Sequence, residues 1–174
     1  MTRHPGGSAQ TLRLIGLAAL PQGARVLDLG AGDGDGVRLL RSLGYDAAGV
    51  DRHAAPGVEA GDLLRTRFAD ESFDAVLSEC AFFLTGDVPG ALRESARLLK
   101  PGGVLMLADV FFQPAAPLLE AAGLRPEQEE DLTEAWREYY LRSVWEGTAD
   151  ACPTPKGACR YQMLIGRKMI HGSV

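Results

Sequence analysis

Short apolar runs alternate along the chain with apolar residues spaced three or four apart, the two patterns typical of buried strands and of helices. The clearest runs are VLDL, DAVLS and VLMLADV, each bounded by glycine, proline or charged residues. Together with weaker runs they predict seven strands, over residues 24–30, 46–51, 57–62, 73–80, 104–110, 126–132 and 161–169. Because helical patterns separate most of them, we expect an α/β fold with a doubly wound, mostly parallel sheet and helices on both faces.

Five helices are predicted in the intervening segments. The first spans residues 8–20, is capped by Ser8 and stops at Pro21, and its inward face is expected to hold Leu12, Ile15 and Ala19. The second ends at Gly44 and carries Val37, Leu40 and Leu43. Asp87 caps the third, which ends at the KPGG of residues 100–103 and carries Val88, Leu92, Ser95 and Leu99. The remaining two are expected after Pro114 as far as Ala122, and from Thr133 through Trp145.

The last of these helices holds an aromatic stripe, WREYYLRSVW, with Trp136, Tyr139, Tyr140 and Val144 at helical spacing. Aromatic side chains bury large areas, so this stripe favours a core position. The alternative is that Trp136, Tyr139 or Tyr140 forms a wall of a binding site. The RHPGG segment near the N-terminus also leaves two interpretations open, an arm over a bound ligand or a disordered end.

The segment VLDLGAGDGDG, residues 26–36, places four glycines and three aspartates at the first turn from strand to helix. In a doubly wound sheet this turn approaches the ligand most closely. The dinucleotide pattern G-x-G-x-x-G fails here, because counting from Gly30 and Gly32 the third glycine position is Asp35. Asp33 and Asp35 would also repel a pyrophosphate. A positively charged sulfonium and α-ammonium suit an acidic turn better, which favours S-adenosylmethionine.

VLDLGAGDG resembles motif I of the class I S-adenosylmethionine-dependent methyltransferases, small single-domain members of type 11 in particular. The similarity continues through GVD, GDLL, FADESFDAVLSE and ALRESARLLKPGGVLMLAD, so five ordered motifs cover residues 24–110. The resemblance implies a Rossmann-like, seven-stranded sheet whose last strand is antiparallel. It also implies S-adenosyl-L-methionine as methyl donor and S-adenosyl-L-homocysteine as product.

The resemblance assigns cofactor-binding roles by position. Asp28 would orient the turn or bind the α-ammonium through water, unless it only caps the following helix. Asp51 would hold the ribose hydroxyls, Arg52 and His53 would lie along the adenine edge, and Asp62 with Leu63 would contact adenine. Ser78 would face the methionine end. The floor under the methionine moiety would consist of Gly30, Ala31, Gly32 and Gly34.

Methyl transfer from a sulfonium is an in-line displacement, so positioning and desolvation matter most and a base is needed only if the acceptor loses a proton. Glu79, at the carboxyl end of the fourth strand, is the first candidate base. His4, His53 and Asp109 are weaker candidates, for each of which a solvated surface role is an equal alternative.

Cys80 follows Glu79, and Cys152 and Cys159 flank the loop before the last strand. With that strand antiparallel, as the resemblance implies, all three thiols would border one cleft. Cys80 could then join in catalysis by holding a soft acceptor such as a thiol or metalloid. The competing interpretation is a small buried Cys80 and two incidental loop cysteines. No C-x-x-C pair supports a metal site, and none is predicted.

The chain has 174 residues, a formal net charge of −5 and no stretch rich in Lys and Arg. We therefore expect one methyltransferase domain over residues 1–174, with an N-terminal arm and helix at 1–21 and a loop at the active-site edge at 147–159. No secretory signal and no membrane span is evident, so we expect a cytoplasmic monomer or weak homodimer acting on a small molecule, without nucleic acid or membrane partners. The alternatives are a non-catalytic S-adenosylmethionine-binding partner subunit and, less favoured, an NAD(P)-dependent oxidoreductase.

Overall fold

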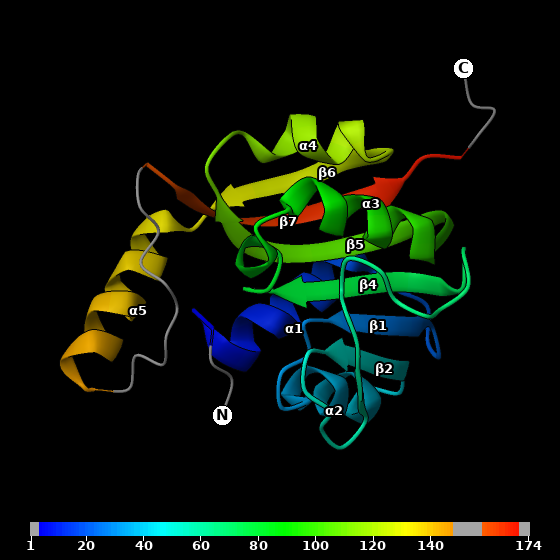
Figure 1. Cartoon of the computed structure of the whole chain (residues 1–174), viewed down its shortest axis with the longest axis horizontal. Coiled ribbons are helices and arrows are strands. Elements are labelled where there is room, and N and C mark those ends of the chain that lie inside the picture. Colours follow the sequence, from blue (N-terminus) through cyan, green and yellow to red (C-terminus); the bar gives the residue numbers. More distant parts are fainter. Residues whose placement is uncertain (1–3, 148–157, 171–174) are drawn as a thin grey trace.

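A computed structural model describes residues 4–147 and 158–170. Seven strands form one sheet in the order β3-β2-β1-β4-β5-β7-β6 (Figure 1). Strand β7 pairs antiparallel with both β5 and β6, and the remaining pairings are parallel. The predicted doubly wound sheet with an antiparallel last strand is therefore confirmed.

The strands lie close to their predicted positions. Their bounds are β1 Arg25–Leu29, β2 Asp46–Asp51, β3 Val58–Ala60, β4 Phe73–Glu79, β5 Leu99–Phe111, β6 Leu124–Asp131 and β7 Arg160–Lys168. Strand β5 begins earlier than expected, because Leu99 and the KPGG of residues 100–103 are already extended and belong to the strand, not to the end of the preceding helix. Strand β3 is only three residues long, half of the segment predicted for it.

The helices are α1 Gly7–Ala18, α2 Asp35–Ser42, α3 Val88–Leu98, α4 Ala115–Ala121 and α5 Thr133–Trp145, with a short 3-10 turn at Phe83–Thr85. Asp87 caps α3 as predicted, by accepting a hydrogen bond of 2.8 Å from the Gly90 amide. Gly44 lies just beyond α2 with φ +87°, the left-handed conformation expected where a helix closes. The bounds of α5 agree with the prediction.

The prediction for the first helix is wrong in its details. Helix α1 begins after Gly6 rather than at a Ser8 cap, and it turns its Leu14, Ile15 and Ala18 face to the core. Leu12 is 44% exposed, and Ala19 lies beyond the last helical residue. The polar residues Gln10 and Thr11 lie on the buried side instead. Apolar residues lie on two neighbouring faces of this helix, one with Leu12 and one with Leu14 and Ala18. The helix is rotated so that the second face, together with Gln10 and Thr11, is buried.

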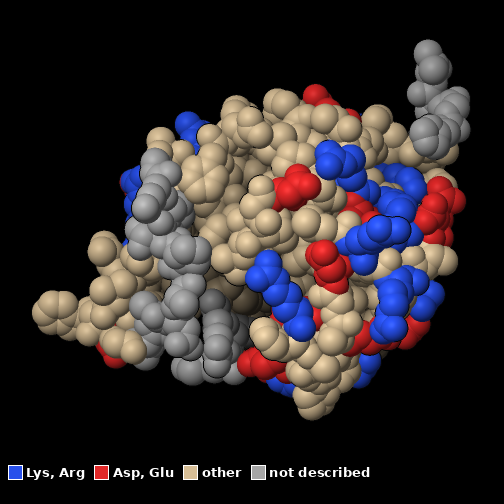
Figure 2. Space-filling model, in the orientation of Figure 1, with Lys and Arg blue, Asp and Glu red and all other residues tan. Residues whose placement is uncertain are grey.

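Helices cover both faces of the sheet, which separates two cores (Figure 1). Helices α1 and α2 pack on one face, where their core includes Leu14, Val37 and Leu40. Helices α3 and α4 pack on the other, with Leu92 and Leu119. Figure 2 shows charged side chains of both signs gathered on the side where the parallel strands begin, away from the carboxyl ends that the glycine-rich segment follows.

Helix α5 projects from the carboxyl side of the sheet (Figure 1). Trp136 is buried and its ring stacks with those of Tyr140 and Tyr161, at centroid distances of 6.2 and 6.4 Å. The core interpretation of the aromatic stripe therefore holds for Trp136. Farther along, Val144 is 53% exposed and Trp145 91% exposed. Within the described ranges no helix has both the length and the apolar character that crossing a membrane requires.

Candidate active site

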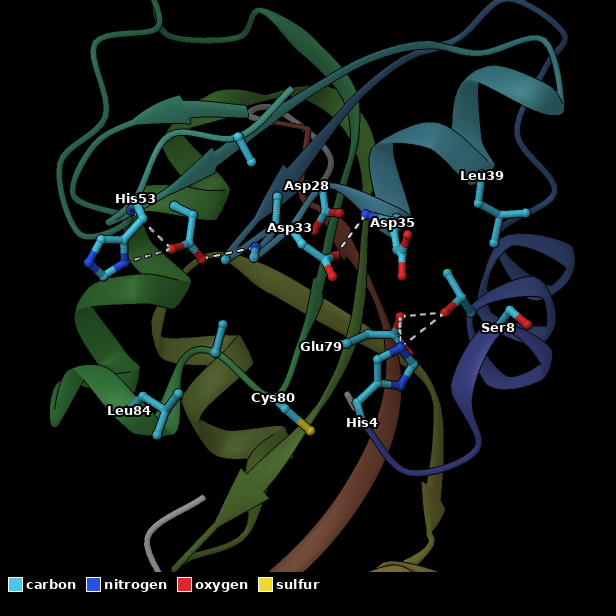
Figure 3. A pocket seen from close by; sticks show the side chains of 18 of the residues that line it. His4, Ser8, Asp28, Asp33, Asp35, Leu39, His53, Glu79, Cys80 and Leu84 are labelled. Atoms are coloured by element: carbon cyan, nitrogen blue, oxygen red, sulfur yellow. Dashed lines mark hydrogen bonds and ion pairs between the residues drawn. The ribbon is translucent and has the colours of Figure 1, made fainter. Parts of the chain in front are cut away.

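A pocket of about 910 Å³ opens at the carboxyl ends of β1, β2 and β4. Its walls come from the segment after β1, the first turn of α2, the residues after β2 and β4, and the N-terminal segment, defined as residues 4–11. Figure 3 shows His4 and His53 on opposite sides of this space, with the acidic side chains between them. The carboxylates that line it are Asp28, Asp33, Asp35, Asp51 and Glu79. Among the described lining residues none is Lys or Arg.

The glycine turn, residues 30–36, is fixed by close backbone approaches. The amides of Gly30 and Ala31 both donate to the Val50 carbonyl, at 2.8 and 3.1 Å. Gly30 has φ +86°, and a Cβ there would lie 2.2 Å from the Cβ of Ala81. Gly32 also has a positive φ, +52°, but a Cβ there would meet nothing within 4 Å. The turn thus packs against the loop after β4 at Gly30 and leaves room at Gly32.

Asp28 lies at the bottom of the pocket, on β1, and is 5% exposed. A Cβ on Gly36 would lie 2.2 Å from Asp28 Oδ2, so the carboxylate rests against the first turn of α2 where only a glycine fits. Burial, with smaller contributions from Glu79 and Asp51, raises the pKa of Asp28 to about 8. This acid is therefore a buried member of the site rather than an ordinary solvent-facing helix cap.

Asp51 ends β2 and joins two turns of the pocket. Its Oδ2 accepts the Gly32 amide at 3.0 Å, and its Oδ1 accepts the His53 amide at 3.2 Å. The side chain is 25% exposed and borders the cavity, while that of His53 is 93% exposed. Asp51 thus presents carboxylate oxygens at the pocket edge, as a group that binds hydroxyls must.

Glu79 closes the far side of the pocket, where it contacts the N-terminal segment. Thr11 Oγ1 donates to Glu79 Oε2 at 2.7 Å, and His4 Nε2 lies 3.4 Å from the same oxygen. Gln10 Nε2 lies 3.5 Å from Oε1 and also donates to the Tyr161 hydroxyl at 2.9 Å. Burial raises the pKa of Glu79, while His4 and the hydrogen bonds act against the rise. Glu79 is both a pocket acid and the anchor of the N-terminal segment.

Asp109 is fully buried, which rules out the solvated surface role considered for it. Its Oδ2 accepts the amides of Ala81 and Phe82 at 3.1 and 2.8 Å. Burial raises its pKa to about 6, although these backbone hydrogen bonds lower it. Asp109 therefore holds the loop after β4 in place, and it is absent from the pocket lining.

The structure does not bring every predicted site residue to the pocket. Ser78 is completely buried and donates to the Leu29 carbonyl at 2.7 Å, because strand alternation turns it to the face opposite Glu79. Gly34, Arg52, Asp62 and Leu63 also lie outside the lining. Asp62 accepts the Leu64 amide at 2.9 Å in a local turn, and Leu63 Cδ2 lies 3.9 Å from the Cβ position of Gly30. Leu63 thus packs behind the glycine turn.

Two of the three cysteines can be placed. Cys80 borders the pocket, half-buried, with a left-handed φ of +54°, and its Sγ lies 3.6 Å from the Tyr161 hydroxyl. Cys159 comes directly before β7 at the same sheet edge, as predicted, but it does not line the pocket. Cys152, with residues 148–157 of the predicted edge loop, lies outside the described residues. In the described part of the chain, no group of three or more His, Cys, Asp or Glu is arranged to hold a metal.

Sequence reasoning missed several residues that line the pocket. They are Ser8, Thr11, Gly36, Leu39, Ala54, Ala55, Ala81 and Leu84. A signal existed for Thr11, because a helix face of Thr11, Leu14, Ile15 and Ala18 places one polar group at the pocket end of an otherwise apolar stripe. Gly36 was within the quoted motif, but its contact with Asp28 depends on how α2 sits over β1.

Comparison with known proteins gives a match over part of the chain. Residues 27–107, from within β1 to within β5, match the model of a family described as a methyltransferase domain. The matched segment, slightly less than half of the chain, resembles a methyltransferase domain. This segment holds the glycine turn, Asp51 and Glu79, so these pocket residues belong to the matched part of the chain.

Curated relatives of this methyltransferase domain act on different compounds. Arsenite methyltransferase of Aquipseudomonas alcaligenes is 36% identical over 119 residues, which are 53% of this chain and 34% of the relative. Demethylmenaquinone methyltransferase of Corynebacterium kroppenstedtii is 36% identical over 105 residues, covering 55% and 45%. The chain thus spans about a third to a half of the length of these relatives.

The methyltransferase fold itself extends beyond the matched residues. The structure of phosphoethanolamine N-methyltransferase 2 of Haemonchus contortus, in complex with S-adenosyl-L-methionine, superposes with a TM-score of 0.73. The alignment covers 96% of this chain and 54% of that one, at 18% sequence identity. At this identity the likeness concerns the fold alone.

Proposed function

We propose that the protein is an S-adenosylmethionine-dependent methyltransferase acting on a small molecule. The observation that carries the proposal is the charge of the pocket, in which five carboxylates and no described Lys or Arg line one cavity of the methyltransferase domain. Carboxylates in a poorly solvated cleft repel a pyrophosphate, which is also negative, but stabilise a positively charged sulfonium or ammonium. A bound donor of this kind supplies an electrophilic methyl group.

The residues present fit such a donor. Asp51, at the pocket edge beside Gly32, would accept the ribose hydroxyls, and the open side of Gly32 would leave space for the methionine moiety. Asp28 would face the cationic end. Gly30, Ala31 and Gly34 would shape the turn, whereas Asp62, Leu63 and Arg52 could reach adenine only from outside the described lining. Ser78 would act only through the backbone it supports.

The methyl acceptor is proposed to be a small soft nucleophile, a thiol or a metalloid. Cys80 lines the pocket near Glu79, where a thiolate could hold a soft atom beside the donor. An arsenite methyltransferase among the relatives supports this class. Glu79 would accept the proton that a thiol or hydroxyl acceptor loses.

The test is release of S-adenosylhomocysteine by the full chain, with arsenite plus glutathione, glutathione alone, an amine and a phenol compared as acceptors. Turnover is expected with arsenite or the thiol. Cys80→Ser should lower that turnover at least tenfold, whereas Cys159→Ser, outside the described lining, serves as the matched control. Turnover only with the amine or phenol would overturn the soft acceptor but not the methyltransferase.

A further inference from the structure

Two buried carboxylates face the pocket from neighbouring strands. Asp28 on β1 pairs in register with Leu77 on β4, so Glu79 lies two residues farther along β4 on the same face of the sheet. Asp28 is 5% exposed and the Glu79 side chain 8%. Water can therefore solvate neither charge fully, and each carboxylate adds to the cost of ionising the other.

The surroundings of Asp28 offer little compensation. Asp51 at the end of β2 acts on it, and Asp33 and Asp35, before and at the start of α2, line the same pocket. Gly36 of α2 leaves no room for a Cβ beside Asp28 Oδ2. Of these, Asp35 is paired with Arg38. The carboxylates of Glu79 and Asp51 thus add negative potential at Asp28, and the positive end of α2 opposes them.

Glu79 is better satisfied. Thr11 donates to it, Gln10 lies within reach, and His4 Nε2 is 3.4 Å away. His4 Nδ1 lies 3.1 Å from the Pro5 carbonyl oxygen. Tyr161 of β7 and Cys80 complete the surroundings. Burial raises the pKa of both carboxyls, that of Asp28 to about 8.

We propose that Asp28 and Glu79 together hold one proton in the free protein, release it when the positively charged methyl donor binds, and regain one during methyl transfer. This inference rests on the proposed function. It assigns to the pair a role that neither residue has alone, because donor binding itself generates the base.

The charges and atoms balance over one turnover. The acceptor heteroatom bonds to the methyl carbon with its lone pair, and the bond between that carbon and the sulfonium sulfur breaks with its electron pair going to sulfur. The acceptor's proton passes to the Glu79 carboxylate at the pocket wall. Because the sulfur is then neutral, the pocket again favours a protonated pair. The protonated pair would hold the thioether product, which lacks the sulfonium charge, less tightly than the ionised pair holds the donor.

Isothermal titration of the full chain with S-adenosylmethionine, in buffers with small and large ionisation enthalpies at pH 7, measures the proton release. Roughly one proton should leave per donor bound, and clearly less with S-adenosylhomocysteine. The Kd for S-adenosylmethionine should therefore decrease as the pH rises, by up to about tenfold for each pH unit, until the pH reaches about 8.

Variants locate the source of the proton. Asp28→Asn and Glu79→Gln should each reduce the release with S-adenosylmethionine. Asp35→Asn is the matched control, because Asp35 lines the same pocket but its pKa lies below the ordinary value and it is paired with Arg38. That variant should leave the proton count unchanged.

Each outcome has a distinct meaning. Binding without proton release, equal release with donor and product, or release that persists in the Asp28→Asn Glu79→Gln double variant would overturn the shared proton and leave the methyltransferase proposal standing. Failure of the folded chain to bind either compound would overturn both. The comparison of donor with product uses wild-type protein, so it remains decisive if a variant does not fold.

Discussion

The glycine turn and the N-terminal segment line the same pocket, but different forces hold them there. The turn is fixed by backbone hydrogen bonds to Val50 and by a contact at Gly30 that leaves no room for a side chain. The N-terminal segment is held by side-chain hydrogen bonds to one buried acid, Glu79. Steric contacts tolerate almost no change, whereas polar contacts respond to protonation and to ligands. We call the side formed by the glycine turn the donor side, because the donor is proposed to bind there, and the side formed by the N-terminal segment and Glu79 the proposed acceptor side. The donor side is therefore the rigid one, and the acceptor side the adjustable one.

The largest effect is expected at Gly30. Gly30→Ala places a Cβ 2.2 Å from that of Ala81 and imposes a side chain at φ +86°, so unfolding free energy should fall by roughly 2–5 kcal/mol. Gly32→Ala, at φ +52° in open space, should cost only about 1 kcal/mol. Urea unfolding of the two variants measures the difference. Equal losses would show that packing does not fix the turn.

Next in size is the aromatic stack on the acceptor side. Trp136→Ala should reduce the unfolding free energy by roughly 3 kcal/mol, because the buried ring stacks with Tyr161 and packs in the core below α1. Trp145, 91% exposed on the same helix, is the control, and Trp145→Ala should change stability by less than about 0.5 kcal/mol. Thermal unfolding followed by circular dichroism separates them. Strong destabilisation by Trp145→Ala would contradict this and would mean that the Trp145 side chain packs against another surface in solution.

A smaller effect is expected at Thr11. Thr11→Val removes the hydroxyl that donates to Glu79 and should cost about 1–3 kcal/mol, since the buried carboxylate loses its closest donor. Thr11→Ser keeps the hydroxyl and should lose clearly less. Hydrogen exchange of α1 amides provides the local readout, with faster exchange expected in the valine variant alone. Similar exchange in both variants would contradict the anchoring role of Glu79.

The smallest expected effect is the change in unfolding free energy per pH unit that Asp28 causes. Its folded pKa of about 8 lies above the ordinary value of 3.8, so the folded state binds more protons than the unfolded state between these values. Stability should therefore fall as pH rises from about 4 to 8, by at most about 1.4 kcal/mol per unit from this group. Asp28→Asn should flatten the slope in urea unfolding at pH 5, 6.5 and 8. An unchanged slope would assign it to other groups, Asp109 among them.

The donor side could be predicted from the sequence because its pattern is local. The apolar runs of β1, β4 and β5 and the glycines between β1 and α2 indicate the sheet, the turn and the carboxylates at its edge. Local rules also placed the Asp87 cap and the left-handed Gly44.

The acceptor side depends on contacts between residues far apart in the chain. Thr11 and Glu79 are separated by 68 positions, and Gln10 and Tyr161 by 151. The local pattern of residues 7–18 marks Thr11 as a polar group on an otherwise apolar helix face, but it does not indicate that this group meets Glu79. Ser78 shows the same limit, since its orientation follows from the register of β4, where Leu77 and Glu79 face the pocket side instead. Such positions require the fold before their roles can be inferred.

The central claim is that an acid-lined pocket in this methyltransferase domain binds a positively charged methyl donor. Calorimetric titration of the full chain with S-adenosylmethionine and, separately, with NAD at neutral pH tests it most directly. Saturable binding of S-adenosylmethionine and no measurable binding of NAD is the expected result. Tight binding of NAD by protein that ignores S-adenosylmethionine would contradict the account.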